Sequence, residues 1–228
     1  MRLRHIEGAA EAVAANQRVI GEQEAPDWRG KWQQLFAAEK RPIHLEIGMG
    51  RGRFIIASAA ACPDISFIGL ELREEVIMQA LERYGELPDN LRILWLNAAM
   101  LEEVFAPGEV ERIYLNFPDP WPKNRHYKRR LTWNDYLLRY QHILTAGGSL
   151  RFKTDNRQLF DWSVERFSEN GWLQQLLSYD LPLEDAGVIS EYEARYRRRG
   201  LPIYCGQWQR PQLVSASDNG TDEELIKL

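Results

Sequence analysis

The sequence predicts an α/β protein built on an open, doubly wound sheet of seven strands, mostly parallel, with an antiparallel hairpin at one edge. From residue 43 onwards, short apolar runs alternate with helix-length stretches, which is typical of βαβ units and a parallel sheet. A glycine-rich turn directly follows the first of these runs and precedes the first helix-like stretch. The last two strand candidates fit an antiparallel edge hairpin.

The elements follow one another in a regular order. Strands are predicted at 43–47, 66–70, 92–96, 112–117, 149–154, 172–179 and 202–209. Helices are predicted around 53–61, around 73–84, over 132–145 and after a cap at Asp155 or Asn156. The domain boundaries that follow are an N-terminal extension of one or two helices outside the sheet (1–42), the main domain (43–210) and a loose acidic tail (211–228).

Composition limits the class of protein. The chain has 228 residues, of which 44% are hydrophobic and 27% charged, as in a soluble globular protein. No charge-free apolar run approaches the ~18 residues of a membrane span, and the start lacks the hydrophobic core of a signal peptide, so we expect a cytoplasmic protein without a membrane partner. Cys62 and Cys205 are too few for a disulfide framework and have no metal-ligand spacing, so no metal is expected.

Positive charge is concentrated in two segments. The net charge is −4, but residues 123–130 contain five Lys or Arg and residues 195–199 contain four. An acidic protein with dense basic segments suits a localised phosphate-binding face better than general coating of nucleic acid. A solvated charged surface is the alternative, although aromatic and proline residues crowd the first segment.

The glycine-rich turn predicts a nucleotide-like cofactor. It carries Glu46, Gly48 and Gly50, but the sixth position counted from Gly48 is Arg53, so the dinucleotide fingerprint fails. The looser pattern suits a ligand without a pyrophosphate, such as S-adenosylmethionine. Glu71 ends the second strand, where a carboxylate can accept hydrogen bonds from both ribose hydroxyls.

Two further polar residues have open alternatives. Glu46 is expected to pair with the cationic amino-acid end of the cofactor, or else to be a strand-end carboxylate satisfied by loop amides. Asn97 ends the third strand, where it is expected either to hydrogen-bond the adenine or to cap a helix.

The segment after the fourth strand carries a family resemblance. It reads NFPDPWPK (116–123) followed by RHYKRRL (125–131), and it strongly resembles the bacterial tRNA (guanine-N7-)-methyltransferases. The resemblance continues through KTDN (153–156), SEYE (190–193) and GLPIY (200–204), and covers roughly residues 43–207. It implies a Rossmann-like class I methyltransferase fold and transfer of a methyl group from S-adenosylmethionine to N7 of a guanine at position 46 in the variable loop of tRNA, with S-adenosylhomocysteine as the other product.

The resemblance also implies residue roles. Cofactor contacts are expected from Glu46, Glu71, Asn97 and Asp119, with Asp119 as the catalytic residue. Substrate contacts are expected from Lys123, Asp155, Ser190, Glu191, Tyr192 and Glu193. RNA contacts are expected from Arg125, His126, Tyr127, Lys128, Arg129 and Arg130. The chain departs from the usual family pattern at Asn97, Asn124 and Ser190.

The chemistry needs positioning more than base catalysis. Guanine N7 already carries a lone pair, so Asp119 is assigned to orientation and to stabilising the positive charge that methylation places on the ring. The alternative is a turn aspartate between two prolines. Asp155 and Glu193 are candidate partners for the N1 and N2 donors of guanine; alternatively, Asp155 caps the following helix and Glu193 pairs with nearby arginines.

Two competing functions remain open at this level. The first is a methyltransferase acting on an exocyclic amine, because Asn-Phe-Pro-Asp faintly resembles the motif of that class. The second is a non-catalytic RNA-binding module with a methyltransferase fold, against which the acids at 46, 71 and 119 argue. The sequence does not decide between a monomer and a homodimer.

Overall fold

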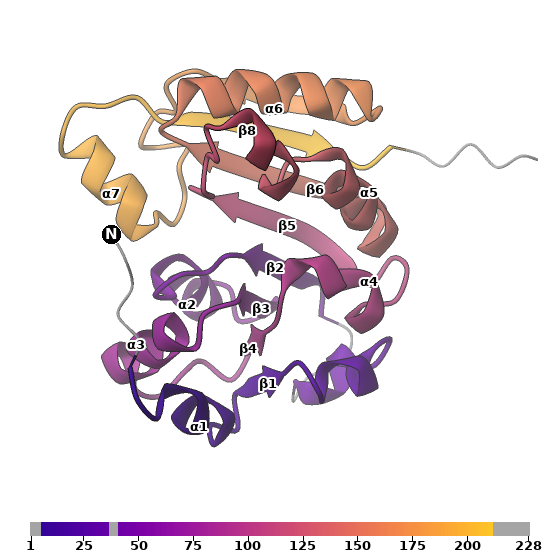
Figure 1. The fold of residues 1–228 in the computed structure, drawn as a ribbon, viewed down its shortest axis with the longest axis vertical. Helices are drawn as coiled ribbons and strands as arrows, with labels where there is room; N and C mark the ends of the chain where they lie inside the picture. Colours follow the sequence, from indigo (N-terminus) through magenta and orange to yellow (C-terminus); the bar gives the residue numbers. More distant parts are fainter. Residues whose placement is uncertain (1–5, 37–40, 212–228) are drawn as a thin grey trace, which may run out of the picture.

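An eight-stranded sheet runs through the computed structural model, which describes residues 6–36 and 41–211 (Figure 1). The strand order is β1-β4-β3-β2-β5-β6-β8-β7. Neighbouring strands from β1 to β6 pair in parallel, whereas β8 pairs antiparallel with both β6 and β7. The strands are β1 (Val19–Gly21), β2 (Ile43–Ile47), β3 (Ser66–Glu71), β4 (Leu91–Trp95), β5 (Val110–Asn116), β6 (Leu144–Thr154), β7 (Leu173–Ser178) and β8 (Tyr204–Gln209).

The sheet has eight strands and not the expected seven, because the N-terminal segment adds a strand, β1. β1 pairs in parallel with β4, with Val19 opposite Ile93, and extends the sheet beyond the predicted edge. A three-residue strand is too short to show the alternation by which strands are recognised. Around it lie the helix α1 (Ala9–Ala14) and two short 3-10 helices, η1 (Ala25–Trp28) and η2 (Trp32–Leu35).

The remaining helices lie on the two faces of the sheet or beside the ends of its strands. They are α2 (Arg53–Ala61), α3 (Glu74–Tyr84), η3 (Ala98–Met100), α4 (Leu101–Val104), η4 (Asn124–Arg129), α5 (Asn134–Ile143), α6 (Arg157–Glu169) and α7 (Glu191–Arg197). One buried cluster joins α1, α2 and α3 to the sheet, and a larger one joins α4, α5 and α6 to it. Burial of apolar side chains on both faces of the central strands supplies the main stabilisation.

A third, small core lies beneath α7. Leu181, Ile203 and Cys205 are buried there, and Phe117 and Tyr196 pack against them. This core seats the connection between β7 and β8 against the carboxyl ends of β5 and β6, so α7 stands beside the end of the sheet where ligands bind in such folds (Figure 1).

The strand order places a crevice at the carboxyl ends of β2 and β5. β2 pairs with β3 on one side and with β5 on the other, and the chain reverses its direction of winding at this point. Helices of the described residues are all too short or too polar to cross a membrane. Residues 6–36 and 41–211 also contain no cluster of metal-ligating side chains. The predicted acidic tail lies almost entirely outside the described residues.

Candidate active site

The glycine-rich turn after β2 offers an open backbone surface. Gly48 and Gly50 have φ angles of 77° and 56°, a region that side chains disfavour. A Cβ atom at either position would meet no other atom within 4 Å. The amides of Gly48 and Met49 donate to the carbonyl of Leu70 at 2.8 and 2.9 Å, which ties the turn to the end of β3. The turn is therefore fixed in place while one side of it remains free for a ligand.

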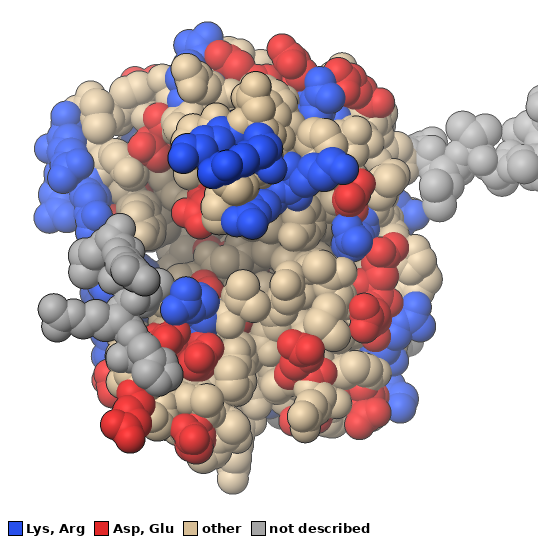
Figure 2. All heavy atoms as spheres, in the orientation of Figure 1, with Lys and Arg blue, Asp and Glu red and all other residues tan. Residues whose placement is uncertain are grey.

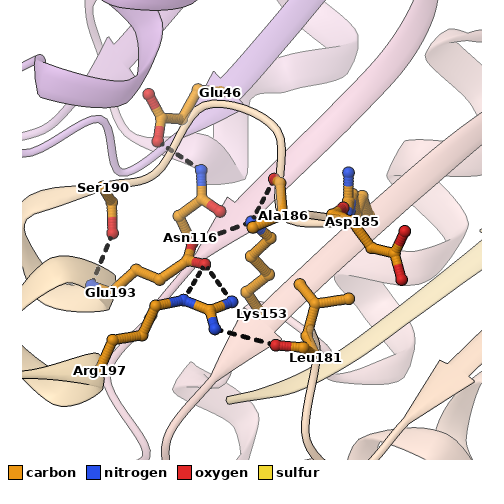
Figure 3. A network of polar contacts seen from close by, with 10 residues as sticks. Glu46, Asn116, Lys153, Leu181, Asp185, Ala186, Ser190, Glu193 and Arg197 are labelled. Atoms are coloured by element: carbon orange, nitrogen blue, oxygen red, sulfur yellow. Dashed lines mark hydrogen bonds and ion pairs between the residues drawn. The ribbon is translucent and has the colours of Figure 1, made fainter. Parts of the chain in front are cut away.

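Glu46 is a buried carboxyl group with an unused oxygen. Its side chain is on β2, and Nδ2 of Asn116 at the end of β5 donates to Oε1 at 2.8 Å (Figure 3). Oε2 is buried and has no hydrogen-bond partner among the described residues. Burial raises the pKa of Glu46 to about 8, and the nearby charge of Glu71 adds to that rise, whereas the hydrogen bond from Asn116 and the nearby backbone amide of Ile55 oppose it. A buried acceptor of this kind requires a donor, and a ligand ammonium group would satisfy it.

Glu71 connects β3 to the glycine-rich turn. Oε2 accepts from the amide of Gly50 at 3.1 Å, and Oε1 accepts from the amides of Leu72 and Arg73 at 2.9 and 3.1 Å. Burial raises the pKa of Glu71, and these three amides act in the opposite direction. A carboxylate has about four acceptor sites, so capacity remains for the hydroxyls of a ribose.

Asn97 caps a short helix and keeps a free donor group. Its Oδ1 accepts from the amide of Ala99 at 2.9 Å, at the start of η3. The side chain is exposed, and its Nδ2 makes no hydrogen bond within the described residues. The cap that the sequence left as an alternative is therefore present, and it does not use the amide group that an adenine contact would need.

The loop after β5 has a strained backbone, and aromatic stacking keeps it in this conformation. Phe117 and Trp121 have φ angles of 54° and 40°, in the left-handed region that is costly for bulky residues. The Phe117 ring stacks on Tyr192 and Tyr196 at centroid distances of 6.3 and 5.8 Å, and its amide donates to the carbonyl of Lys153 at 2.8 Å. The loop conformation is thus set by contacts with α7 and β6.

Asp119 lies on this loop between the two strained residues. Its side chain is exposed and makes no hydrogen bond or ion pair within residues 6–36 and 41–211. A turn aspartate would accept hydrogen bonds from the backbone of its own loop, and none is present. The carboxylate is free to act on a bound molecule.

The basic segment divides into free and anchored side chains. Lys123, Arg125, Lys128 and Arg129 are exposed, and they form no ion pair in the described part of the chain. His126 and Tyr127 are half-buried, with ring centroids 5.7 Å from Trp121 and 5.8 Å from Trp162 respectively.

Arg130 behaves differently from its neighbours. It is 6% exposed, and its guanidinium donates to the carbonyls of Pro120 and Trp121 at 2.9 and 3.3 Å. The same group stacks between the rings of Tyr127 and Trp162, 3.9 and 4.4 Å from their centroids. Arg130, which the sequence suggested as an RNA contact, fixes the Asp119 loop in this structure.

The SEYE segment forms the start of α7 and is strongly anchored. Ser190 caps the helix by accepting from the amide of Glu193 at 3.1 Å. Glu193 is 1% exposed, and its two oxygens accept from Lys153 at 2.9 Å and from Arg197 at 2.8 Å (Figure 3). Glu191 forms an ion pair with Arg83 on α3. Glu193 therefore pairs with cations inside the protein, which is the alternative that the sequence had left open for it.

Asp155 remains available at the mouth of the crevice, together with exposed Tyr192. Asn156, not Asp155, caps α6, since its Oδ1 accepts from the amide of Leu159 at 2.8 Å. Asp155 is half-buried and lies near Tyr196, whose pKa is raised mainly by burial and further by this carboxylate.

Four residues complete the site although the sequence reasoning gave them no role: Asn116, Lys153, Arg83 and Tyr196. Lys153 had a usable signal, because a lysine inside the apolar run of a central strand requires a buried partner. Arg83 had none, since only the fold brings it to Glu191.

Known proteins resemble this chain in sequence and in fold. A family model described as a putative methyltransferase matches residues 40–206. The tRNA (guanine-N(7)-)-methyltransferase of Lachnoclostridium phytofermentans is 44% identical over 90% of this chain and 96% of its own length. The enzyme of the same name from Geobacillus thermodenitrificans is 45% identical over 92% of this chain and 98% of its own.

Solved structures agree at the level of the fold. The 16S rRNA methyltransferase KamB matches with a TM-score of 0.59 at 17% identity, over 80% of this chain and 94% of its own. The 16S rRNA (adenine(1408)-N(1))-methyltransferase from Catenulisporales acidiphilia matches with a TM-score of 0.57 at 15% identity, over 82% of this chain and 94% of its own. Given the identity to the curated relatives over nine-tenths of its length, this chain belongs to the tRNA (guanine-N7-)-methyltransferase family.

Proposed function

We propose that this protein transfers a methyl group from S-adenosylmethionine to N7 of a guanine in tRNA, at position 46 of the variable loop. The observation that carries the proposal is the free carboxylate of Asp119, which lies on the loop between β5, the strand that pairs with the Glu46 strand β2, and η4 with its unpaired cations. The family to which the chain belongs supports the same reaction. A tRNA substrate implies a cytoplasmic site of action.

The chain's own residues fit the cofactor. Buried Oε2 of Glu46 lacks a donor, which the amino group of the cofactor would supply, and Glu71 offers acceptor sites to the ribose. The open side of Gly48 and Gly50 leaves room for close approach, and the amide of Asn97 is free for the adenine. When bound, S-adenosylmethionine supplies a methyl group on a sulfonium centre.

On the substrate side, the chain positions a base and stabilises charge. The Asp119 loop, fixed by Phe117 and Arg130, presents a carboxylate that favours the positive charge developing on the guanine ring. Asp155 is our candidate partner for the N1 and N2 donors of guanine, since Glu193 is fully engaged inside the protein. Lys123, Arg125, Lys128 and Arg129 are available to contact phosphates.

A labelling experiment tests the proposal. Unmodified tRNA transcripts with guanine or adenine at position 46 are incubated with protein and methyl-labelled S-adenosylmethionine, and the nucleosides are separated. We expect label only in 7-methylguanosine, and only with the guanine transcript. Label in an N2-methylated guanosine or in a methyladenosine would show a different reaction, and cofactor binding without any transfer would favour the non-catalytic RNA-binding module.

A further inference from the structure

The carboxyl end of α7 carries a basic cluster whose charges are not paired with acids in the described part of the chain. We define the α7 cluster as Arg195, Arg198 and Arg199, all of which are exposed. Within residues 6–36 and 41–211, none of the three forms an ion pair. Arg198 donates to the carbonyl of Ala194 at 3.2 Å, and Arg195 lies 5.5 Å from the ring centroid of Tyr192.

The acids near the cluster, Asp155 included, form no ion pair with it in the described part of the chain. Glu191 is paired with Arg83, and both oxygens of Glu193 are held by Lys153 and Arg197. Cations favour the carboxyl end of a helix, but Arg197 already provides one there, donating to the carbonyl of Leu181 at 2.9 Å. Three further positive charges within five residues repel one another, and an external anion would relieve that repulsion.

The α7 cluster is held rigidly at the mouth of the crevice. The buried pair Lys153–Glu193 fixes α7 to β6, and the stacking of Tyr196 on Phe117 fixes it to the Asp119 loop. The charges of Arg195 and Arg199 act on the hydroxyl of Tyr196 and oppose the rise of its pKa. Because the Asp155 carboxylate acts on the same hydroxyl, these arginines lie in the neighbourhood of our candidate guanine-binding carboxylate.

The surface shows how this cluster relates to the basic segment. Lys and Arg side chains gather over η4 and, separately, over α7 at the left edge of the view, and a hollow opens below the first group and to the right of the second (Figure 2). A base that enters the hollow has backbone phosphates on both sides of it. A single basic patch would hold the strand on one side only, and two patches would hold it on both and fix its direction.

We propose that the α7 cluster is a second phosphate-contacting surface, which binds the tRNA backbone on a different side of the crevice from η4. This inference rests on the proposed function, because the ligand is the same tRNA. The contacts are electrostatic and read no sequence, so they contribute affinity and orientation. Loss of the cluster should raise the KM for tRNA and leave the affinity for the cofactor unchanged.

A salt titration separates this role from an ordinary charged surface. The α7 variant replaces the three residues together (Arg195→Gln, Arg198→Gln, Arg199→Gln). The matched control removes the same charge at the opposite end of the sheet (Arg29→Gln, Lys31→Gln, Arg41→Gln), where Arg41 closely precedes β2 and Gly30 donates to Glu109, just before β5. Binding of an unmodified tRNA transcript is measured between 50 and 300 mM salt, about the range in which phosphate contacts dominate.

In a plot of log affinity against log salt, the slope for the α7 variant should be smaller in magnitude by about two than that for wild type. Each lost phosphate contact accounts for about 0.7 to 0.9 of this change. The control variant should change the slope by less than the amount expected for the loss of one phosphate contact. Replacing the same three arginines by lysine should restore most of the slope, because a phosphate contact needs the charge more than the fork of the guanidinium. Equal slopes for the α7 variant and the control would overturn the inference.

The two proposals fail in different ways. Wild-type protein that forms no 7-methylguanosine in tRNA would remove the proposed function. Wild-type protein that forms it, beside an α7 variant with unchanged KM and unchanged salt slope, would remove only the second phosphate surface.

Discussion

Lys153 Nζ lies 2.9 Å from Oε2 of Glu193, and both side chains are almost completely buried, at 2% and 1% exposure. Lys153 also donates to the carbonyl of Ala186 at 2.9 Å (Figure 3). One lysine on a central strand thereby fixes both the connection after β7 and the first turn of α7. Burial lowers the pKa of Lys153, and the Glu193 carboxylate opposes that change.

Removing this lysine should destabilise the protein and disturb α7. Lys153→Met leaves Glu193 buried with only Arg197 as a partner, and breaking a buried pair costs about 3 to 5 kcal/mol. We expect a loss near the lower end of that range, because Arg197 remains. Urea unfolding measures the loss as a lower midpoint with an unchanged slope.

The double variant provides the control. Lys153→Met combined with Glu193→Gln removes the buried charge as well as its partner, so it should recover part of the lost free energy of unfolding. Simple addition of the two single effects would show that Lys153 and Glu193 do not act as a pair.

Glu46 should release a proton when the cofactor binds. With a pKa raised to about 8 by burial, the carboxyl is mostly neutral at pH 7 in the free protein. An ammonium group at Oε2 favours the carboxylate, so binding should release close to one proton. Titration calorimetry in buffers of different ionisation enthalpy counts these protons. Glu46→Gln should bind the cofactor more weakly and release fewer; equal release by both proteins would contradict the assignment.

The same group should make the stability of the free protein depend on pH. The folded-state pKa lies above the ordinary value of 4.5, so the folded protein binds more protons than the unfolded chain between pH 4.5 and about 8. The contribution of Glu46 to stability is therefore fully present below pH 4.5 and is lost as the pH rises to about 8. Glu46→Gln should raise Tm relative to wild type at pH 8 and have little effect at pH 4.5. A constant difference in Tm would argue against the raised pKa.

Much of the fold could be predicted because most of its strands and helices carry a recognisable pattern within their own few residues. The apolar run at 43–47 and the helical stretch at 53–61 match β2 and α2. β1 was missed because three residues carry no periodicity, and its place is decided by pairing with β4, about seventy residues away.

The site was predictable where residue type decides the chemistry. Glu46 lies near the end of β2, Glu71 ends β3 and Asp119 lies on the loop after β5, as the strand pattern predicted, while the roles expected of all three stay predictions. Arg129 and Arg130 are equivalent in sequence, and it is the tertiary contacts of Arg130, with the rings of Tyr127 and Trp162 and with two loop carbonyls, that make one cation buried and leave the other exposed. Asp155 and Asn156 are equally good caps, and the backbone turn selects the second.

Asp119 should be needed for turnover and not for folding. Asp119→Ala removes the free carboxylate and should abolish most single-turnover transfer. The free energy of unfolding should stay within about 0.5 kcal/mol of wild type, since the side chain is exposed and forms no ion pair in the described residues. Asp119→Asn should recover part of the orientation without the charge. A near-normal rate for the alanine variant would return Asp119 to the role of a turn residue.

The last prediction separates charge from packing within the basic segment. Arg130→Lys keeps the positive charge but loses the planar stack between Tyr127 and Trp162 and the paired donation to Pro120 and Trp121. Because these contacts fix the loop that carries Asp119, we expect kcat to fall at least tenfold, about 1.4 kcal/mol of transition-state stabilisation, with little change in the salt dependence of tRNA binding.

Exposed neighbours should show the opposite behaviour. Replacing Arg125 and Lys128 by glutamine removes two of the proposed phosphate contacts, so the salt slope should flatten by about one to two and the KM for tRNA should rise while kcat at saturation is kept. Arg129→Lys is the matched control for Arg130→Lys, since it makes the same replacement one residue earlier at an exposed position, where the cation lies 5.0 Å from the ring centroid of Trp121. It should retain nearly full kcat. If Arg129→Lys and Arg130→Lys lower kcat equally, or if Arg130→Lys flattens the salt slope as the double glutamine variant does, burial does not divide the segment into anchoring and RNA-contacting arginines.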